Sequence, residues 1–386
     1  MAGNKPRIAY VTHNLNPGGT ERLVVDMSRA LSDSYEVDVV CLDEPGTWAD
    51  ELRNSGISVF CVWRSPGLDL SIIRRLAVLF RQRRTDIIHA HQCTPWFYCA
   101  LSRLLNRGPR LLLEEHGRFY PEQDDAKKRF VNRAIIGRLT HGFVAVSEDV
   151  RRRLIRYEGI PESERIDVIY NGTQWDSNIS DGDRRELREA LGFATSDFVV
   201  GTIGRFDEIK NLPMLIEGIA GAKQRSKRVR GLLVGHGPIF EEIRDLASSL
   251  GLDDAIVFAG YRDDAKELVQ CLDLFVLSSF SEGTSMALLE AMAGGSPVAV
   301  TDVGGNPEIV EKGQTGWVFP SDCPGELTEI ICEAINDPEK TSRFAAAGRD
   351  RYREEFTFDR MIRKYRSIYN ELCATAPESP RSLTQE

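Results

Sequence analysis

The sequence predicts an α/β protein with two doubly wound domains, each built on a parallel sheet. At 386 residues the chain is longer than one hydrophobic core usually organises, and 42% apolar residues are enough for two cores. Short β-branched segments alternate with longer segments of helical pattern, which is typical of βαβ units. This alternation is interrupted once, after residue 172, and then resumes. We therefore expect two domains, one after the other in sequence.

The first domain, residues 1–178, is expected to alternate strands with helices. Each expected strand is followed by roughly ten to twenty residues of helical composition, which suits the crossovers of a parallel sheet. The strands are expected at Arg7–Thr12, Glu36–Leu42, Ser58–Trp63, Asp86–Ala90, Arg110–Glu115 and Phe143–Ser147.

The segment Thr173–Asp183 is polar and contains few residues that could enter a core, so we interpret it as a linker. Asp181 and Asp183 have the Asp-x-Asp spacing of some metal sites. Because this pair falls in a linker and not at the end of a strand, we interpret it as solvated charge and helix capping. We predict no catalytic metal.

The second domain, residues 179–355, is expected to be smaller, with helices at 214–223 and 239–250. Its strands are expected at Phe198–Ile203, Arg230–Val234, Ile256–Phe258, Leu274–Leu277 and Pro297–Thr301. Apolar residues between Phe358 and Leu372 then recur at spacings of three and four, which predicts one amphipathic helix over 356–373. Residues 374–386 form a polar tail that is expected to be disordered.

Composition excludes several classes of protein. No apolar run approaches the roughly 18 residues of a membrane span, and Ile8–Thr12 is too short for a secretory signal. The eight cysteines are scattered without metal-binding spacing, which suits a reducing compartment. The net charge is −9, and no nucleic-acid partner is expected. We expect a cytoplasmic protein, with any membrane contact peripheral and at the inner face.

Basic residues are concentrated in the first domain. Residues 1–170 contain 25 Lys and Arg against 22 Asp and Glu, whereas the rest of the chain contains 24 against 36. Five arginines between Arg74 and Arg84 flank the apolar segment Leu76–Phe80. Two interpretations stay open: an interfacial helix that faces anionic lipid or acceptor, and a solvated helix face whose apolar side enters the core.

The most specific motif is Ser281–Gly295, which follows an expected strand and begins a helix. Gly283 lets a ligand approach the backbone closely, and Thr284 and Ser285 can cap the helix. Gly295 is a helix stop. The N–H groups left free at the helix N-terminus form an anion site that suits a diphosphate.

Two carboxylates lie on either side of this anion site. Glu290 is about 9 Å along the helix axis from the phosphate end, about where the ribose of a nucleotide would lie. Its carboxylate can accept from both ribose hydroxyls. Glu282 precedes the helix, where a transferred sugar would present its hydroxyls.

A second motif, Gly201–Leu212, lies at the end of the first strand of the second domain and contains Gly204-Arg205 and Lys210-Asn211. This Gly-Arg…Lys-Asn segment and the Glu-x7-Glu pair in its Gly-Thr-Ser context resemble the retaining GT-B glycosyltransferases of family 4. The resemblance covers about residues 7–373. It implies two Rossmann-like domains that face a central cleft, with the last helix completing the first domain.

The resemblance also implies roles for individual residues. The catalytic residues would be Arg205, Lys210, Glu282 and His116, and the donor-binding residues Gly18, Gly19, Gly204, Arg262, Gly283, Thr284, Ser285, Leu288 and Glu290. Arg205 and Lys210 would bind the donor diphosphate, which agrees with the negative charge that develops on a departing nucleoside diphosphate. His116 ends a strand where members of the family have a His that contacts the donor sugar.

Several other residues have alternative interpretations. His89 and His91 have an i, i+2 spacing that could suggest a metal site, but no third ligand is evident, so we expect packing or acceptor-side hydrogen bonds. Ser147 resembles part of a family Val-Ser-Glu segment, with helix capping as its main role. Gly304-Gly305 is expected to support the ligand site from behind. Thr173 stands in a segment where the family has Ile/Val-Asp, which leaves a linker Asp contribution in doubt.

The expected function is retaining, metal-independent transfer of a sugar from a nucleotide-sugar, with UDP favoured over GDP, to a lipid-linked or saccharide hydroxyl. The pathway would be polysaccharide, cell-envelope or glycolipid biosynthesis, and no cofactor is expected. One alternative is a GT-B nucleotide-sugar epimerase, which needs acid and base groups over the sugar ring. Another is a non-enzymatic two-domain sugar-binding protein, which needs no phosphate site. A nicotinamide dehydrogenase is disfavoured because no Gly-x-Gly-x-x-Gly follows a strand.

Overall fold

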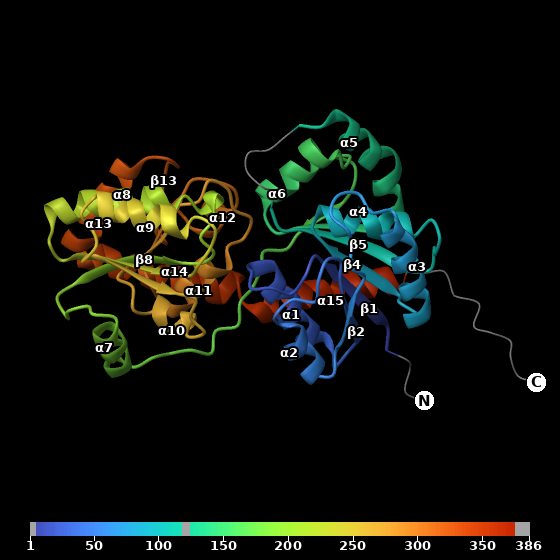
Figure 1. Cartoon of the computed structure of the whole chain (residues 1–386), viewed down its shortest axis with the longest axis horizontal. Helices are drawn as coiled ribbons and strands as arrows, with labels where there is room; N and C mark the ends of the chain where they lie inside the picture. The colour runs from blue at the N-terminus through green and yellow to red at the C-terminus, as the bar shows by residue number, and fades with distance from the viewer. Residues whose placement is uncertain (1–4, 118–123, 375–386) are drawn as a thin grey trace, which may run out of the picture. The chain divides into compact units, whose positions relative to one another are not determined.

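The computed structural model describes residues 5–117 and 124–374. The chain divides into two units, each built around one parallel sheet (Figure 1). Unit 1 contains the described residues up to Gly117, those from 124 to Tyr170, and those from Met361; unit 2 runs from Asn171 to Arg360. This division after Tyr170 comes earlier in the chain than residue 178. The predicted tail over 374–386 lies outside the described residues, apart from Ala374, which ends the last helix.

Unit 1 contains a seven-stranded sheet in the order β3-β2-β1-β4-β5-β6-β7, in which every pairing is parallel. The strands are β1 (Arg7–Thr12), β2 (Glu36–Cys41), β3 (Ser58–Cys61), β4 (Ile87–His91), β5 (Arg110–Glu115), β6 (Gly142–Ala145) and β7 (Ile166–Val168). The helices are α1 (Gly19–Leu31), α2 (Ala49–Asn54), α3 (Ser71–Arg83), α4 (Cys93–Ser102), α5 (Ala126–Val131), α6 (Glu148–Arg153), η1 (Asn132–Ile136), η2 (Gly137–Leu139) and η3 (Leu154–Glu158).

Unit 2 contains a six-stranded parallel sheet in the order β10-β9-β8-β11-β12-β13. The strands are β8 (Phe198–Ile203), β9 (Val229–Val234), β10 (Ile256–Gly260), β11 (Leu274–Leu277), β12 (Val298–Thr301) and β13 (Trp317–Phe319). The helices are α7 (Asp181–Ala190), η4 (Glu208–Lys210), α8 (Leu212–Arg225), α9 (Phe240–Ser249), α10 (Ala265–Val269), α11 (Met286–Gly294), α12 (Asn306–Ile309), α13 (Pro324–Asn336) and α14 (Pro338–Glu355).

The predicted fold class, two Rossmann-like parallel-sheet domains, is confirmed. All eleven strands expected from the sequence are present, with ends that differ by at most two residues. The sequence analysis missed β7 and β13, because a three-residue strand is too short to establish a periodic pattern. Strands such as β4 are buried at every position, as expected of a parallel sheet covered on both faces.

The sheet order of each unit contains a switch point, where successive connections run in opposite directions. In unit 1 it lies between β1 and β4, and in unit 2 between β8 and β11. Ligands of doubly wound proteins bind beyond the carboxyl ends of the strands at this point. Ligand-binding residues are therefore expected in the loops that follow these four strands.

Local sequence accounts for two helix starts that were predicted as caps. Ser147 accepts a hydrogen bond from the Val150 N–H at 3.1 Å and caps α6. Ser180 and Asp183 form a reciprocal capping box at α7, and Asp181 is the first residue of that helix. Asp183 therefore takes part in capping the helix, and Asp181 adds negative charge to its first turn, which favours the helix dipole.

The last helix, α15 (Phe358–Ala374), starts at the end of unit 2 and from Met361 belongs to unit 1. Its apolar residues are buried, as the three-and-four spacing predicted. The Tyr369 hydroxyl lies 3.0 Å from the Tyr10 hydroxyl of β1. This helix therefore contributes polar groups to the interior of unit 1.

Candidate functional site

The loops after β8 and β11 meet at the switch point of unit 2. Lys210 Nζ donates to Glu282 Oε1 at 2.6 Å, and Ser279 Oγ donates to the same oxygen at 2.6 Å. Ser278 Oγ donates to the carbonyl of Lys210 at 2.8 Å. The two motifs identified in the sequence therefore form one hydrogen-bonded site. The two serines were not predicted, because only the fold places their hydroxyls beside the Lys210 loop.

Arg205 is the most exposed cation of this site, with 66% of its side chain accessible. Its Nε lies 3.6 Å from Asp207 Oδ2. Burial raises the pKa of Asp207, and the charges of Lys210 and Arg205 partly offset that rise. A small pocket beside these groups is lined by residues of both loops, including Gly204 and Ser278. Arg205 can therefore reach a ligand that enters from solvent.

Helix α11 begins at Met286 and presents its N-terminus next to the Glu282 loop. Ser285 caps it by accepting from the Leu288 N–H at 3.4 Å, and Gly295 ends it in a left-handed conformation with φ of 77°. Both the cap and the stop were predicted. Thr284 and Gly283 precede the helix and are buried, and the Thr284 carbonyl accepts from Asn171 Nδ2 at 3.1 Å.

Glu290 and Leu288, two predicted donor-binding residues of this helix, differ in how far their side chains are exposed. Glu290 is half-buried, and it is the fifth residue of α11, one turn beyond the N-terminus. Leu288 has no exposed surface and belongs to the core. Its side chain therefore cannot face a ligand, and a role in donor binding would be limited to its backbone.

The Gly304-Gly305 turn supports the backbone of Glu282. Gly304 has a φ of +55°, and a Cβ at that position would lie 2.0 Å from the Glu282 carbonyl oxygen. The Gly305 N–H donates to the same oxygen at 3.1 Å. Only glycine allows this approach.

Gly204 and Arg262, the remaining predicted residues of unit 2, also lie just after strands. A Cβ at Gly235, after β9, would lie 1.8 Å from the carbonyl oxygen of Gly204, so the turns after β8 and β9 are in direct contact. Arg262, after β10, donates to both carboxylate oxygens of Asp264 at 2.7 and 2.6 Å. Its guanidinium is thus already engaged within its own turn.

Gly18, Gly19 and His116 are in unit 1. Gly18 is the N-cap of α1 and Gly19 is its first residue. A Cβ at Gly18 would lie 2.2 Å from a carboxylate oxygen of Glu21, so the Glu21 side chain folds over this turn. The structure thus places the predicted residues in two sets, Gly18, Gly19 and His116 in unit 1 and the others in unit 2.

His116 follows β5 and belongs to a buried cluster of polar side chains. His89 Nε2 lies 3.0 Å from Glu114 Oε2, and His91 Nδ1 lies 3.5 Å from the same oxygen. His116 Nε2 lies 3.5 Å from Glu114 Oε1 and 3.0 Å from His91 Nδ1. His89, His91 and Glu114 have no exposed side-chain surface. The sequence analysis found no third partner for His89 and His91, and in this it was wrong, because strand pairing brings Glu114 opposite His91.

Ligand atoms of His89, His91 and Glu114 all lie within 4.8 Å of one another, which would allow a metal ion. A tetrahedral cation about 2.0–2.1 Å from each ligand would separate the ligand atoms by roughly 3.3 Å. The closest contacts of the cluster, both 3.0 Å, are instead hydrogen-bond distances. We therefore interpret the cluster as a network of direct polar contacts, in which His91 Nδ1 and His116 Nε2 share a hydrogen bond.

Burial and charge shift the cluster's pKa values in opposite directions. Burial opposes ionisation of Glu114, but the neighbouring His116 and the hydrogen bond from His89 outweigh it and lower the pKa of Glu114. Burial lowers the pKa of His91 and of His116. The cluster is therefore an ionised carboxylate surrounded by imidazoles.

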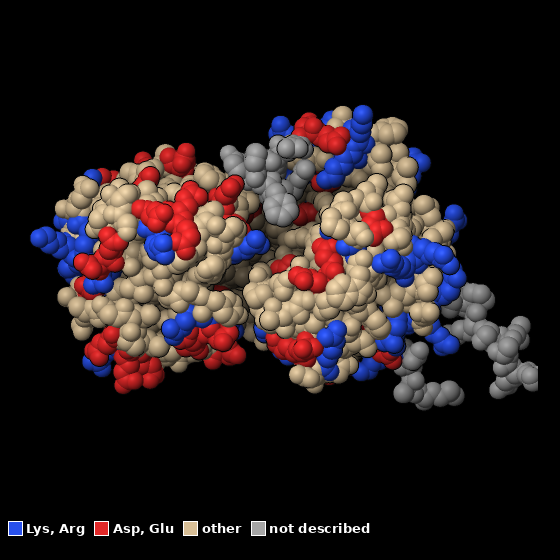
Figure 2. Space-filling view, in the orientation of Figure 1, with Lys and Arg blue, Asp and Glu red and all other residues tan. Residues whose placement is uncertain are grey.

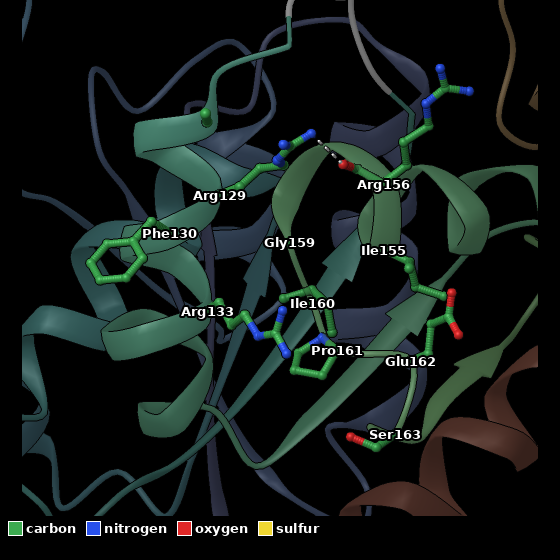
Figure 3. A pocket seen from close by; sticks show the side chains of 11 residues that line it. Arg129, Phe130, Arg133, Ile155, Arg156, Gly159, Ile160, Pro161, Glu162 and Ser163 are labelled. Carbon is green, nitrogen blue, oxygen red and sulfur yellow. Dashed lines mark hydrogen bonds between the residues drawn. The ribbon is translucent and has the colours of Figure 1, made fainter.

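A larger pocket of about 660 Å³ lies elsewhere in unit 1, between α5, η3 and the loop 159–163 (Figure 3). Arg129, Arg133 and Arg156 surround it, and Arg129 Nη1 donates to the carbonyl of Arg156 at 3.4 Å. It includes none of the predicted site residues. We assign it no part in donor binding.

The basic residues of α3 form an exposed patch at the edge of unit 1 (Figure 2). Arg74, Arg75, Arg81 and Arg84 are exposed, whereas Leu76 and Phe80 are buried. The apolar side of α3 thus enters the core, as one of the two open interpretations expected. Across residues 5–117 and 124–374, the helices lack the combination of length and hydropathy needed to cross a bilayer.

Two Rossmann-like units with a cation pair and a helix N-terminus at one switch point define the GT-B class of glycosyltransferases. Comparison with known families agrees. The model for Glycosyltransferase Family 4 matches residues 17–174, and the model for glycosyl transferases group 1 matches residues 183–351. The chain belongs to this family of glycosyltransferases.

Curated relatives resemble the chain over most of its length. The putative glycosyltransferase EpsF of Bacillus subtilis is 27% identical over 365 residues, which is 90% of each chain. N-acetyl-alpha-D-glucosaminyl L-malate synthase of Bacillus anthracis is 25% identical over 334 residues, 81% of this chain and 82% of the relative. Among solved structures, Anabaena Alr3699/HepE in complex with UDP and glucose has a TM-score of 0.83 and 25% identity, and covers 95% of this chain and 100% of its own.

Proposed function

We propose that this glycosyltransferase moves a sugar from a UDP-sugar to a hydroxyl acceptor with retention of configuration, and that it requires no metal. The observation that carries the proposal is the contact of Lys210 with Glu282 beside the N-terminus of α11. Cations and free backbone N–H groups suit a diphosphate, and the carboxylate suits sugar hydroxyls. UDP is favoured because the Anabaena neighbour was crystallised with UDP, with UDP and glucose, and with UDP-glucose.

In the proposed reaction the bond between the anomeric carbon and the diphosphate oxygen breaks, and negative charge develops on the phosphate. Arg205, Lys210 and the N-terminus of α11 stabilise this charge, which replaces the role that a divalent cation has in other enzymes. Glu282 and His116 hold the sugar by its hydroxyls. The acceptor oxygen attacks on the face that the phosphate leaves, and the departing phosphate takes the acceptor's proton.

Thermal-shift measurements with UDP, GDP, ADP and their sugars test the donor site. We expect UDP to stabilise the wild type, and Arg205→Ala and Glu290→Ala to lose that stabilisation. Arg244→Ala is the matched control, because Arg244 is an exposed arginine of α9 in the same unit that contacts Glu241 and Asp245. A wild type that no nucleotide stabilises would contradict the proposal.

Product analysis tests the reaction itself. We expect the anomeric configuration of the donor in the product, and rates that excess EDTA leaves unchanged. Loss of activity with EDTA, with recovery on adding Mg²⁺ or Mn²⁺, would contradict the metal-independent route. Turnover of the donor to an epimer without any acceptor would indicate a nucleotide-sugar epimerase instead.

For the acceptor we propose a lipid-linked or saccharide hydroxyl of polysaccharide, cell-envelope or glycolipid synthesis, reached at an anionic membrane surface. The exposed arginines of α3 support this, together with the exposed Trp63, Leu68 and Leu70 in the loop before it. Sedimentation with phosphatidylglycerol vesicles should exceed that with phosphatidylcholine, and Arg74→Glu with Arg81→Glu should abolish the difference. Equal sedimentation with both lipids would contradict the membrane proposal.

A further inference from the structure

The buried cluster of unit 1 connects His116 to the C-terminal helix through one carboxylate. On one side Glu114 lies 3.5 Å from His116 Nε2, and on the other it lies 3.0 Å from His89 Nε2. His89 Nδ1 in turn lies 2.8 Å from the hydroxyl of Tyr369 on α15. Tyr369 also contacts the Tyr10 hydroxyl of β1 at 3.0 Å. A continuous chain of polar contacts therefore runs from α15 to His116.

The direction of the hydrogen bonds follows from the chemistry of the groups. An ionised carboxylate only accepts, so the His89 nitrogen that faces Glu114 must carry the proton. His89 Nδ1 shares a hydrogen bond with the Tyr369 hydroxyl, and Tyr369 shares another with Tyr10. His116 Nε2 shares a hydrogen bond with His91 Nδ1 at 3.0 Å, so one of these two nitrogens donates to the other, and Glu114 lies 3.5 Å from each of them. His116 Nδ1 is buried and has no hydrogen-bond partner in the described part of the chain.

Strand geometry fixes the cluster rigidly. His91 and Glu114 are paired residues in the β4–β5 register. The side chains of His89, His91 and Glu114, at the ends of these strands, are all buried. Glu115, on the opposite face of β5, accepts from Cys93 Sγ at 2.9 Å and from the Gly117 N–H at 3.1 Å. The carboxylate of Glu115 thus holds the backbone beside His116, and the carboxylate of Glu114 contacts the His116 ring.

We propose that Glu114 and Tyr369 are positioning residues for His116, and that together with His91 they fix the orientation of its ring so that it meets a hydroxyl of the donor sugar. The proposal rests on the proposed function, since it deepens the role given there to His116. It implies that α15 must be packed against unit 1 for His116 to hold the sugar correctly. Donor binding alone does not require this. Neither residue is expected to touch the nucleotide.

The test compares Glu114→Gln and Tyr369→Phe with Asp38→Asn, which removes another buried carboxylate of the same unit, one that pairs with Arg83 and Arg7. We expect Glu114→Gln to lower kcat by about tenfold or more and Tyr369→Phe by several-fold, while Kd for UDP stays within about twofold of wild type. Asp38→Asn should keep the wild-type kcat even where its thermal stability falls. A fall in kcat for Asp38→Asn that equals the fall for Glu114→Gln would overturn the proposal.

A second readout does not depend on turnover. The chain has six histidines, so ¹⁵N-labelled histidine gives few enough ring signals to assign by single substitutions. We expect one ordered set of His116 ring signals in the wild type, and changed or averaged ring signals in Glu114→Gln. Unchanged His116 signals in Glu114→Gln would overturn the proposal whatever the activity shows. Stoichiometric zinc in the purified protein would also overturn it, because a cation would then hold the imidazoles.

These outcomes separate the proposal from the proposed function. If the wild type transfers sugar and Glu114→Gln equals it in kcat and in ring signals, only the positioning role fails. If the wild type binds no nucleotide and transfers no sugar, the proposed function fails, and the positioning role in catalysis fails with it.

Discussion

The Nζ atom of Lys210 lies 2.6 Å from Oε1 of Glu282, although 72 positions separate the two residues in the sequence. The pair is largely shielded, with 25% and 10% of the two side chains exposed. Glu282 thus neutralises a cation that the proposed diphosphate also needs. A ligand phosphate near Lys210 must compete with this carboxylate, so Glu282 is expected to restrain nucleotide binding while it serves the sugar.

Glu282→Gln should therefore separate binding from transfer. Removing the negative charge frees Lys210 and should tighten UDP binding by about three- to tenfold. The loss of a charged partner for the sugar hydroxyls should slow transfer by about 100-fold. Calorimetry with UDP and a transfer assay measure the two effects. The control is Glu329→Gln, an exposed glutamate of α13 that pairs with Arg225. Weaker UDP binding by Glu282→Gln would contradict the competition.

Lys210→Met should weaken UDP binding by roughly 10- to 100-fold, because it removes one charge-assisted bond to phosphate. In the double variant with Glu282→Gln, the gain from losing the carboxylate should disappear, since no cation remains to be freed. Dissociation constants of the wild type, both single variants and the double variant form a cycle that measures this coupling. Additive effects across the cycle would contradict competition for Lys210.

Gly304→Ala should destabilise the protein and slow transfer together. Its backbone is left-handed, and its new Cβ would meet the Glu282 carbonyl, so we expect a loss of about 2–4 kcal/mol in unfolding free energy. Gly313→Ala is the matched control, with φ of +76° and open space around the Cβ position. It should cost about 1 kcal/mol and leave transfer unchanged. Equal losses in both variants would show that contact with Glu282 is unimportant.

His141 should make the stability of unit 1 sensitive to acid. Burial, and then the charges of Arg103 and Arg110, lower the pKa of His141 to about 4. Since the folded pKa lies below the unfolded one, this group's contribution is present above about pH 6.5 and is lost as the pH falls towards 4. Urea unfolding at pH 7 and pH 5 measures it. His141→Gln, which retains an acceptor for the Leu111 N–H, should lose less stability on acidification than wild type, and the exposed His236→Gln should behave as wild type.

Local patterns account for much of what was predicted. The alternation of strands and helices, the cap at Ser285 and the stop at Gly295 depend only on residues close together in the chain, so they could be found without the fold. The ends of elements and the three-residue strands β7 and β13 were missed, because three residues are too few to show a periodic pattern. Leu288 lies within a sequence motif, but its position in the motif does not reveal which way its side chain points.

The sequence by itself determined the two parallel-sheet units and the polar loops at their switch points, because periodicity, capping and glycine placement are local properties. Only the tertiary structure decided which distant groups meet. The register of β4 against β5 sets Glu114 opposite His91, and α15 brings Tyr369 to His89 across 280 positions of sequence. Strand order likewise brings Lys210 to Glu282. Such contacts depend on register and on docking between elements, which are set by the packing of whole sheets and helices and leave no local pattern.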